Sequence, residues 1–312
     1  MFFLSRLDID RRISQMRREL EERGIQEELR GWSWNNPPVS PPLREMTLSV
    51  SELASRYCPT MRDIYLRRVR FIRPPPSIKM ARGIAFHKIS HDSLIDVKRI
   101  IYSSENLSGS LVVEKLLPRA GEEAEAALRE AESRTMKLNQ QEGQILLKEC
   151  EDLYKFLVIQ AASQIDQAMS KFPHAGPDSI ASIAIPPVAE RKVDGTLVGL
   201  SSELSVDLYA PASMVIDLKT GEVRKFHPYI AAGYALAIEA QESVPVNFGL
   251  IIYLKFEERS VPSIRTKYFL ISDEIRREFL EMRDEAFQLI LSGKDPGKPG
   301  FCPDYCPYYG VC

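Results

Sequence analysis

The spacing of hydrophobic and polar residues divides the chain into a helical first half and a mixed second half. Apolar residues recur at helical spacing over 5–30, which predicts an amphipathic helix. A second helix is expected over 79–101, and the stretch 121–171, rich in Ala, Glu, Leu and Gln, favours one or two long helices. Another helix is expected from 49 or 51 to about 69, and Pro59 predicts a break or bend within it.

After Pro173 the helical pattern gives way to short runs of β-branched and aromatic residues. The predicted strands are 182–185, 197–209, 214–218, 247–256 and 264–270. Helices are expected over 224–242 and 272–291. Strands with an intervening helix, after a helical first half, predict a mixed α/β fold.

The proline-rich stretch GWSWNNPPVSPP, at 31–42, predicts a loop or linker. We divide the chain accordingly. The parts are an N-terminal helix and linker over 1–45, a helical region over 46–175, a core over 176–295 and a cysteine-containing tail over 296–312.

Length and charge limit the classes of function. The chain has 312 residues, enough for a full hydrophobic core. Its 41 basic and 43 acidic residues give a net charge of −2, so any contact with DNA requires a local basic patch. The short apolar run at the N-terminus predicts neither a signal peptide nor a membrane span. We therefore expect a cytoplasmic protein, in which clustered cysteines more often bind metal than form disulfides.

Two acidic residues and a lysine form the first candidate site. Asp207 lies in a predicted strand, and Asp217 and Lys219 flank Leu218 in the segment MVIDLKTG. Because side chains alternate along a strand, Asp217 and Lys219 share one face. Two carboxylates and the Leu218 carbonyl are suitable ligands for Mg²⁺ or Mn²⁺, and a lysine beside them suits phosphodiester hydrolysis. A salt bridge at the end of a strand is the alternative interpretation.

His87 lies in the helix predicted over 79–101, on a face shared with His91 and with apolar residues. That position predicts a side chain turned toward the core. A structural histidine is the first alternative, and a zinc-binding pair of His87 and His91 is the second.

Four cysteines lie near the two ends of the chain. Cys58 is separated by the whole predicted core from Cys302, Cys306 and Cys312. Four thiolates suit either tetrahedral zinc or a four-iron cluster, and the three-plus-one arrangement favours the cluster. Unrelated buried thiols are the alternative. Cys150 lies in a leucine-rich helical stretch and is predicted to be a core residue.

A basic run extends from Arg56 to Arg82, with eight basic residues against Asp63 alone, a net charge of +7. Its natural partners are backbone phosphates, although a solvated helix face is an equal alternative. The candidate DNA-binding residues are Arg62, Arg67, Arg68 and Arg82. Three aromatic residues lie in the same run, for which core packing is favoured over base stacking. They are Tyr57, Tyr65 and Phe71.

The order of these motifs resembles the RecB-type family of PD-(D/E)xK nucleases. The resemblance runs from Arg82-Gly83 and His87 through Asp207 and Asp217-Leu218-Lys219 to the helix motif ending at Tyr234. It implies a restriction-endonuclease-like core, a mixed central sheet flanked by helices, in which His87, Asp207 and Asp217 surround the metal. It also implies that Lys219 serves the catalytic water and that Tyr234 belongs to the site. Ile230 stands where the family usually has glutamine, which predicts weakened or altered activity.

With the cysteines added, the chain resembles the AddB-type iron-sulfur nucleases and the CRISPR-associated "Cas-four" family, in particular its archaeal subtype I-A "Csa-one" branch. This resemblance implies a 4Fe-4S cluster held as a clasp by the four terminal cysteines. It also implies a Mn²⁺- or Mg²⁺-dependent exonuclease or end-trimming nuclease of CRISPR adaptation. Its substrate would be protospacer DNA, single-stranded or as duplex ends, and its partners the CRISPR integrase and other adaptation proteins. The C-x3-C-x5-C spacing departs from the family's usual C-x2-C.

Two other functions fit the same residues. One is a catalytically weak, nuclease-like scaffold that binds DNA or adaptation proteins, with Ile230 as the sign of lost activity. The other is a regulatory DNA-binding protein with zinc at the four cysteines.

Overall fold

The structure is a computed structural model that describes residues 6–55, 57–185, 189–210, 214–256, 261–303 and 305–312. The α-helices are α1 (Arg6–Arg23), α2 (Val50–Ala54), α3 (Arg62–Arg68), α4 (Ile78–Ser103), α5 (Gly109–Leu116), α6 (Ala120–Arg134), α7 (Gln140–Lys171), α8 (Pro177–Ala184), α9 (His227–Glu242) and α10 (Asp273–Ser292). None of the described helices has both the length and the apolar character that a membrane crossing requires.

A five-stranded sheet lies at the centre of the fold. Its strands, in both chain order and spatial order, are β1 (Ala189–Val193), β2 (Leu204–Ala210), β3 (Met214–Lys219), β4 (Phe248–Lys255) and β5 (Ser263–Leu270). All neighbouring strands are antiparallel except β3 and β4, which are parallel. A parallel pair needs a crossover connection, which α9 supplies. The predicted mixed α/β fold is thus confirmed.

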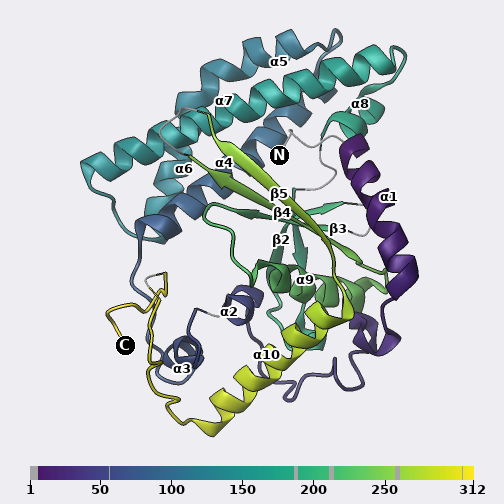
Figure 1. Cartoon of the computed structure of the whole chain (residues 1–312). Helices are drawn as coiled ribbons and strands as arrows, with labels where there is room; N and C mark the ends of the chain where they lie inside the picture. The colour runs from purple at the N-terminus through teal and green to yellow at the C-terminus, as the bar shows by residue number, and fades with distance from the viewer. Residues whose placement is uncertain (1–5, 56, 186–188, 211–213, 257–260, 304) are drawn as a thin grey trace.

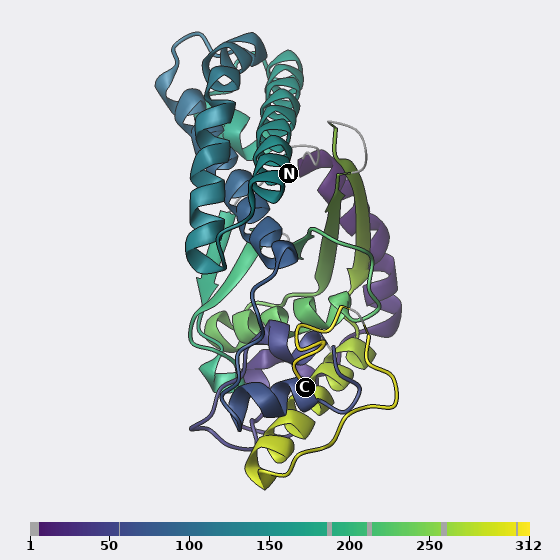
Figure 2. The same cartoon turned by 90° about the vertical axis from the view of Figure 1, so that its left-hand side faces the viewer.

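Helices cover both faces of the sheet (Figure 1). Met214, Ile216 and Leu218 of β3 pack into a core shared with α4, α6, α7 and α8. Val215, from the other face of the same strand, packs with α2, α9 and α10. Figure 2 shows the long helices as an upright bundle beside the sheet. The helices α9 and α10 lie toward the opposite end of the molecule. Alternation along β3 therefore places Asp217 and Lys219 on the face that Val215 shares with α9.

Several predicted elements differ from those in the structure. The strand predicted over 182–185 is wrong, because this segment ends α8, where Pro177 starts the helix and Ile180 and Ala184 pack into the core. The strand predicted over 197–209 begins only at Leu204, after the 3-10 turn η4 (Thr196–Val198). Neither β1 nor α5 was predicted.

The helix expected from 49 to 69 is two short helices, α2 and α3, separated on either side of Pro59 as the proline predicted. Ser49 starts α2 through a capping box with Glu52. The stretch predicted over 121–171 is the helix pair α6 and α7.

The proline-rich segment is a loop, as predicted, and it is bonded to α10. The fully buried guanidinium of Arg283, on α10, donates hydrogen bonds to the carbonyls of Pro38, Val39, Ser40 and Val198. Burial lowers the pKa of Arg283, and Asp284 opposes that shift. These bonds hold the loop against α10, with the Val39 side chain completely buried.

A second buried network joins the N-terminal segment to the sheet layer. Glu239 on α9 accepts two hydrogen bonds from Arg276 on α10, at 2.8 and 2.9 Å, and one from Arg30 at 2.8 Å. The backbone N–H groups of Gly31 and Val246 also donate to this carboxylate. Although burial raises the pKa of Glu239, the attraction of Arg276 and these bonds hold it below its ordinary value. A Cβ on Gly31 would lie 2.0 Å from the Leu236 carbonyl oxygen, so only glycine fits this approach.

Candidate functional site

Asp217 and Lys219 form an ion pair at the end of β3. The Lys219 ammonium lies 3.0 Å from Oδ1 of Asp217, to which it donates a hydrogen bond, and 2.8 Å from Oδ2. Burial acts to lower the pKa of Lys219, but the charges of Asp217 and Asp207 raise it above its ordinary value. Lys219 is therefore a protonated ammonium near neutral pH, suited to hydrogen-bond donation and charge stabilisation rather than to proton abstraction.

Asp207, on β2, connects this ion pair to α4. Its Oδ2 accepts a 2.8 Å hydrogen bond from the backbone N–H of Leu218, and its Oδ1 lies 3.3 Å from Nδ1 of His87. Burial raises the pKa of Asp207, and the nearby charge of Asp217 adds to this, whereas His87 and the Leu218 N–H oppose it. Two carboxylates are thus held close together, an arrangement that a cation would stabilise.

His87 lies at the edge of α4 rather than in its core-facing stripe, so the prediction of a core-facing side chain is wrong. The residues of α4 that pack into the core include Ala81, Ala85, Phe86 and Ile89. About a third of the His87 side chain is exposed, and its ring contacts Asp207. His91 lies against Asp92 at 3.1 Å. The two histidines therefore have different partners, which does not favour a zinc pair.

The helix α9 brings Tyr234 close to the two carboxylates. Burial, followed by the charges of Asp217 and Asp207, raises the pKa of the Tyr234 hydroxyl. A neutral hydroxyl donor is thus available beside the acidic pair. Ile230, one turn earlier, is 4% exposed and packs in the core between α9 and its neighbours.

Two further residues border the site that sequence reasoning did not select. Tyr253 of β4 is the register partner of Lys219, and its hydroxyl lies 3.0 Å from Nδ1 of His227 at the start of α9. Burial and the nearby charges of Lys219, Arg224 and Lys267 lower the pKa of His227 to about 3. This imidazole is therefore neutral at physiological pH. The helix motif that ends at Tyr234 begins at His227, but only the pairing of β3 with β4 shows the relation of His227 to the lysine.

The donor atoms of the site suit a hard divalent cation. Asp207, Asp217 and the Leu218 carbonyl supply oxygen, and His87 supplies nitrogen. The Lys219 ammonium lies beside both carboxylate oxygens of Asp217, so a cation would compete with it for this carboxylate. Among the described residues no three His, Cys, Asp or Glu side chains are arranged to hold a metal ion. Cation binding would accordingly replace the contacts that Asp207 and Asp217 make with His87 and Lys219.

The segment after α2 and the C-terminal tail meet beside α3 (Figures 1 and 2). Cys302, Cys306 and Cys312 pack in one small core with Tyr65, Leu66 and Tyr308. Burial raises the pKa of the Cys306 thiol to about 11, and nearby Asp63, Cys302 and Cys58 raise it too. Cysteines from the two ends of the chain therefore lie close together, as the split cysteine pattern predicted.

The tail is fastened by polar contacts as well. Arg62 donates two hydrogen bonds to Asp295, at 2.8 and 2.7 Å, and Thr60 donates one to the Gly297 carbonyl at 2.8 Å. Four thiols suit a four-iron cluster or zinc by their chemistry, but the described residues include no group already at ligating geometry. Cys150 is fully buried on α7, and burial raises the pKa of its thiol to about 12, as expected for a core residue.

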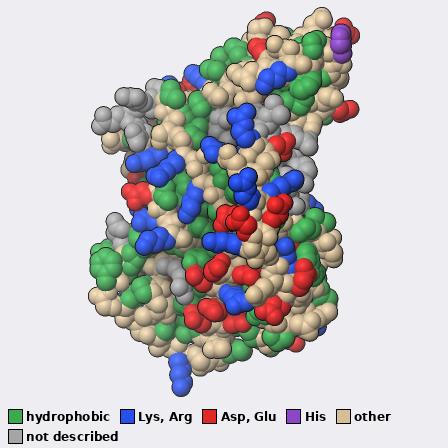
Figure 3. Space-filling model, turned by 45° about the vertical axis from the view of Figure 1, so that its right-hand side comes forward, with side chains coloured by type: hydrophobic (Ala, Val, Ile, Leu, Met, Phe, Trp, Pro, Cys, Tyr) green, Lys and Arg blue, Asp and Glu red, His purple; other side chains and the backbone are tan. Residues whose placement is uncertain are grey.

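Three arginines of the basic run are paired with carboxylates, which its sequence did not indicate. Arg62 pairs with Asp295, Arg68 with Glu52 and Arg82 with Glu149. Arg67 is exposed, and Arg56 lies outside the described residues. Tyr65 is buried, whereas Phe71 is 83% exposed, so core packing is wrong for Phe71. On the face drawn in Figure 3, basic and acidic side chains are interspersed, in agreement with the small net charge.

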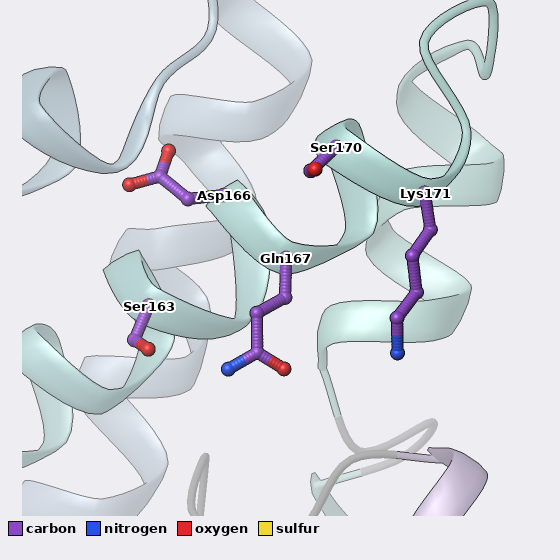
Figure 4. Close-up of a pocket in the computed structure, with 5 residues that line it drawn as sticks. All are labelled: Ser163, Asp166, Gln167, Ser170 and Lys171. Carbon is purple, nitrogen blue, oxygen red and sulfur yellow. The ribbon is translucent and has the colours of Figure 1, made fainter.

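A surface pocket lies away from the candidate site. Its lining residues all come from the last turns of α7 (Figure 4). They are Ser163, Asp166, Gln167, Ser170 and Lys171. Asp166 also accepts the backbone N–H of Gly109 at the start of α5. This pocket includes none of the candidate site residues.

Fold and site together define a mixed α/β protein with a carboxylate–lysine site between α4, β2, β3 and α9. The family model described as CRISPR-associated exonuclease Csa1 matches residues 1–312. A protein of that name from Saccharolobus solfataricus is 35% identical over 295 residues, which cover 93% of each chain. Another, from Thermoproteus tenax, is 30% identical over 290 residues, 92% of this chain and 91% of the relative. The chain belongs to the CRISPR-associated exonuclease Csa1 family, which confirms the family resemblance. No solved structure gives a significant match.

Proposed function

We propose that this protein is a metal-dependent DNA nuclease of CRISPR adaptation, an exonuclease or end-trimming enzyme acting on protospacer DNA with the integrase and other adaptation proteins. The convergence of His87, Asp207, Asp217 and Lys219 from α4, β2 and β3 carries this proposal. The name of its relatives, CRISPR-associated exonuclease, supports it. A sheet with a parallel β3–β4 pair, a crossover helix and helices on both faces supports a PD-(D/E)xK core.

Each residue of the site has a separate role in this proposal. Asp207, Asp217, the Leu218 carbonyl and His87 would hold Mn²⁺ or Mg²⁺. When bound, such a cation lowers the pKa of a coordinated water and offsets charge on the phosphate. The Lys219 ammonium orients the attacking water and donates to a phosphate oxygen, where negative charge increases in the transition state. Tyr234 supplies a second, neutral donor from α9.

The cysteines would hold the 4Fe-4S cluster through Cys58, Cys302, Cys306 and Cys312. A cluster at this position would crosslink the segment before α3 to the tail, so its binding energy would contribute to folding. The same segment continues through α3 to α4, which carries His87. A stable clasp would therefore support the position of this ligand.

The test is cleavage of single-stranded DNA with Mn²⁺ by Asp217→Ala and Lys219→Ala. Both are expected to lose cleavage while their circular dichroism spectra stay native. Lys225→Ala removes an exposed lysine just before α9 and is the matched control, with cleavage unchanged. Retained cleavage in both site variants would contradict the site assignment.

The buried side chain of Ile230 favours a second candidate function, a nuclease-like scaffold that binds DNA without cleaving it. In the active family this helix usually carries glutamine, and here the position packs in the core. Wild-type protein that binds DNA but cleaves it with neither Mn²⁺ nor Mg²⁺ would support the scaffold.

A further inference from the structure

Phe71 is held out from the surface beside the cysteine-containing tail. Its side chain is 83% exposed, whereas Tyr65 and Leu66, a turn earlier on α3, are buried. The loop 70–73 that carries it connects α3 to three prolines and then to α4. An aromatic side chain exposed to this extent is available to bind a ligand.

The backbone at Phe71 is in a conformation that its side chain disfavours. Its φ angle is 54°, in the left-handed region that bulky residues rarely adopt. Hydrogen bonds fix the chain on both sides, from the Arg70 N–H to the Tyr65 carbonyl at 3.1 Å and from the Ile72 N–H to the Leu66 carbonyl at 2.8 Å. Strained residues held by their surroundings concentrate at binding and catalytic sites.

The tail supplies a third anchor. The Tyr308 hydroxyl donates a 2.9 Å hydrogen bond to the carbonyl of Ile72. Tyr308 lies in the same small core as Cys302, Cys306 and Cys312. The position of the Phe71 ring is thereby linked to the cysteine cluster.

The charged residues that flank Phe71 in the sequence are all basic. No Asp or Glu occurs between Asp63 and Asp92, and the loop places Arg70 and Arg73 on either side of Phe71. Both arginines are exposed, and neither forms an ion pair within the part of the chain that the structure describes. The nearby carboxylate of Asp295 is already bound by Arg62 through two hydrogen bonds.

We propose that loop 70–73 is a binding site for single-stranded DNA, in which the Phe71 ring stacks on an unpaired base and Arg70 and Arg73 contact the flanking phosphates. An aromatic face accepts any base, and arginines hold the backbone without reading sequence. The proposal rests on the proposed function for the identity of the nucleic acid. A protein partner would match the exposed ring equally well, but the two arginines favour a polyanion.

The test is binding of a fluorescein-labelled single-stranded oligonucleotide by the full-length protein without divalent cations. Phe71→Gly removes the ring and leaves a residue that adopts this φ freely, so its melting temperature should not fall. We expect its affinity for single-stranded DNA to fall about tenfold or more. Phe71→Trp should keep the affinity, and its added tryptophan emission should be quenched by the oligonucleotide. Phe172→Gly removes another exposed ring, after α7, and should bind like wild type.

A blunt duplex of the same sequence separates stacking from simple charge attraction. Phe71→Gly should bind it about as well as wild type does, because a blunt duplex offers few unpaired bases. Unchanged binding of single-stranded DNA by Phe71→Gly would overturn the proposal and leave the loop to a protein partner. An equal loss for single-stranded and duplex DNA would overturn stacking.

Cleavage distinguishes failure of this inference from failure of the proposed function. If the wild type cleaves with Mn²⁺ and Phe71→Gly binds normally, only the inference fails. If no cleavage is found but Phe71→Gly loses single-strand binding selectively, the inference stands and the scaffold function replaces the nuclease.

Discussion

His87 on α4 lies 3.3 Å from Asp207 on β2, measured between Nδ1 and Oδ1. This contact joins the helical layer to the sheet at the candidate site. Asp207 in turn accepts the backbone N–H of Leu218, which lies between Asp217 and Lys219. Substitution of His87 should therefore change the surroundings of the two carboxylates and leave the sheet intact.

His87→Asn should weaken Mn²⁺ binding, because it removes the proposed nitrogen ligand beside Asp207. Mn²⁺ affinity measured by electron paramagnetic resonance tests this. His91→Asn, which removes the neighbour of Asp92, is the control. Unchanged affinity in His87→Asn would contradict a role of His87 in holding the cation.

Ile230→Gln should destabilise the fold rather than restore a family function at no cost. The side chain is 4% exposed among apolar neighbours, and a buried amide without partners costs about 1–3 kcal/mol. Urea unfolding measures the loss, and Mn²⁺-dependent cleavage by the same variant shows whether the amide reaches the site. Ile230→Val should cost about 1 kcal/mol. Equal stability of Ile230→Gln and wild type would mean that the amide finds partners.

Cys58→Ala and Cys306→Ala should each remove iron, visible absorbance and thermal stability together. Both thiols lie where the two chain ends meet, so losing a ligand opens the proposed clasp. Metal analysis with a visible spectrum and a thermal melt gives the three readings. Cys150→Ala, from the core of α7, should keep the iron. One zinc and no iron in the wild type would contradict the cluster and favour the zinc-bound regulator.

Sequence patterns predicted the elements that carry the candidate site well, because those elements have strong local signals. The segment of Asp217 and Lys219 is strongly apolar and forms β3 at nearly the predicted bounds. His87 was correctly placed on a helix, but its direction was not, since α4 packs through a stripe of small residues that includes Ala81 and Ala85. Periodicity alone does not say which flank of a mostly buried helix meets the sheet.

The contacts that sequence reasoning missed depend on long-range pairing. Tyr253 becomes a neighbour of Lys219 only through the parallel register of β3 and β4. Likewise, the basic run looked free because Glu52, Glu149 and Asp295, which pair with its arginines, lie outside it in sequence. Phe71 was expected to pack in the core, but it is 83% exposed and has a φ angle of 54° that sequence patterns do not reveal.

Arg276→Met should destabilise the protein by about 3–5 kcal/mol, because it leaves the buried Glu239 carboxylate without its main partner. Arg276 and Glu239 are both fully buried, so water cannot replace the lost bonds. Arg277→Met, at the next and half-exposed position, is the matched control and should change stability by about 0.5 kcal/mol or less. Urea midpoints compare the two variants. Equal midpoints would show that the network around Glu239 contributes little.

Stability should fall in acid partly because His227 must take up a proton on unfolding. Its pKa is about 3 in the folded chain, below its ordinary value of 6.5, so the unfolded chain binds the proton first. The contribution of His227 is thus fully present above pH 6.5 and is lost as the pH falls toward 3. Its slope reaches at most about 1.4 kcal/mol per pH unit.

His227→Gln removes this titration and keeps a group able to bond the Tyr253 hydroxyl. The unfolding free energy of the variant, measured by urea between pH 6.5 and about 4, should fall less steeply than that of the wild type. His174→Gln, at an exposed position after α7, is the control and should retain the wild-type slope. If His227→Gln keeps the full acid dependence, then His227 is charged in the folded protein and Tyr253 is held beside Lys219 by an imidazolium, not by a neutral ring.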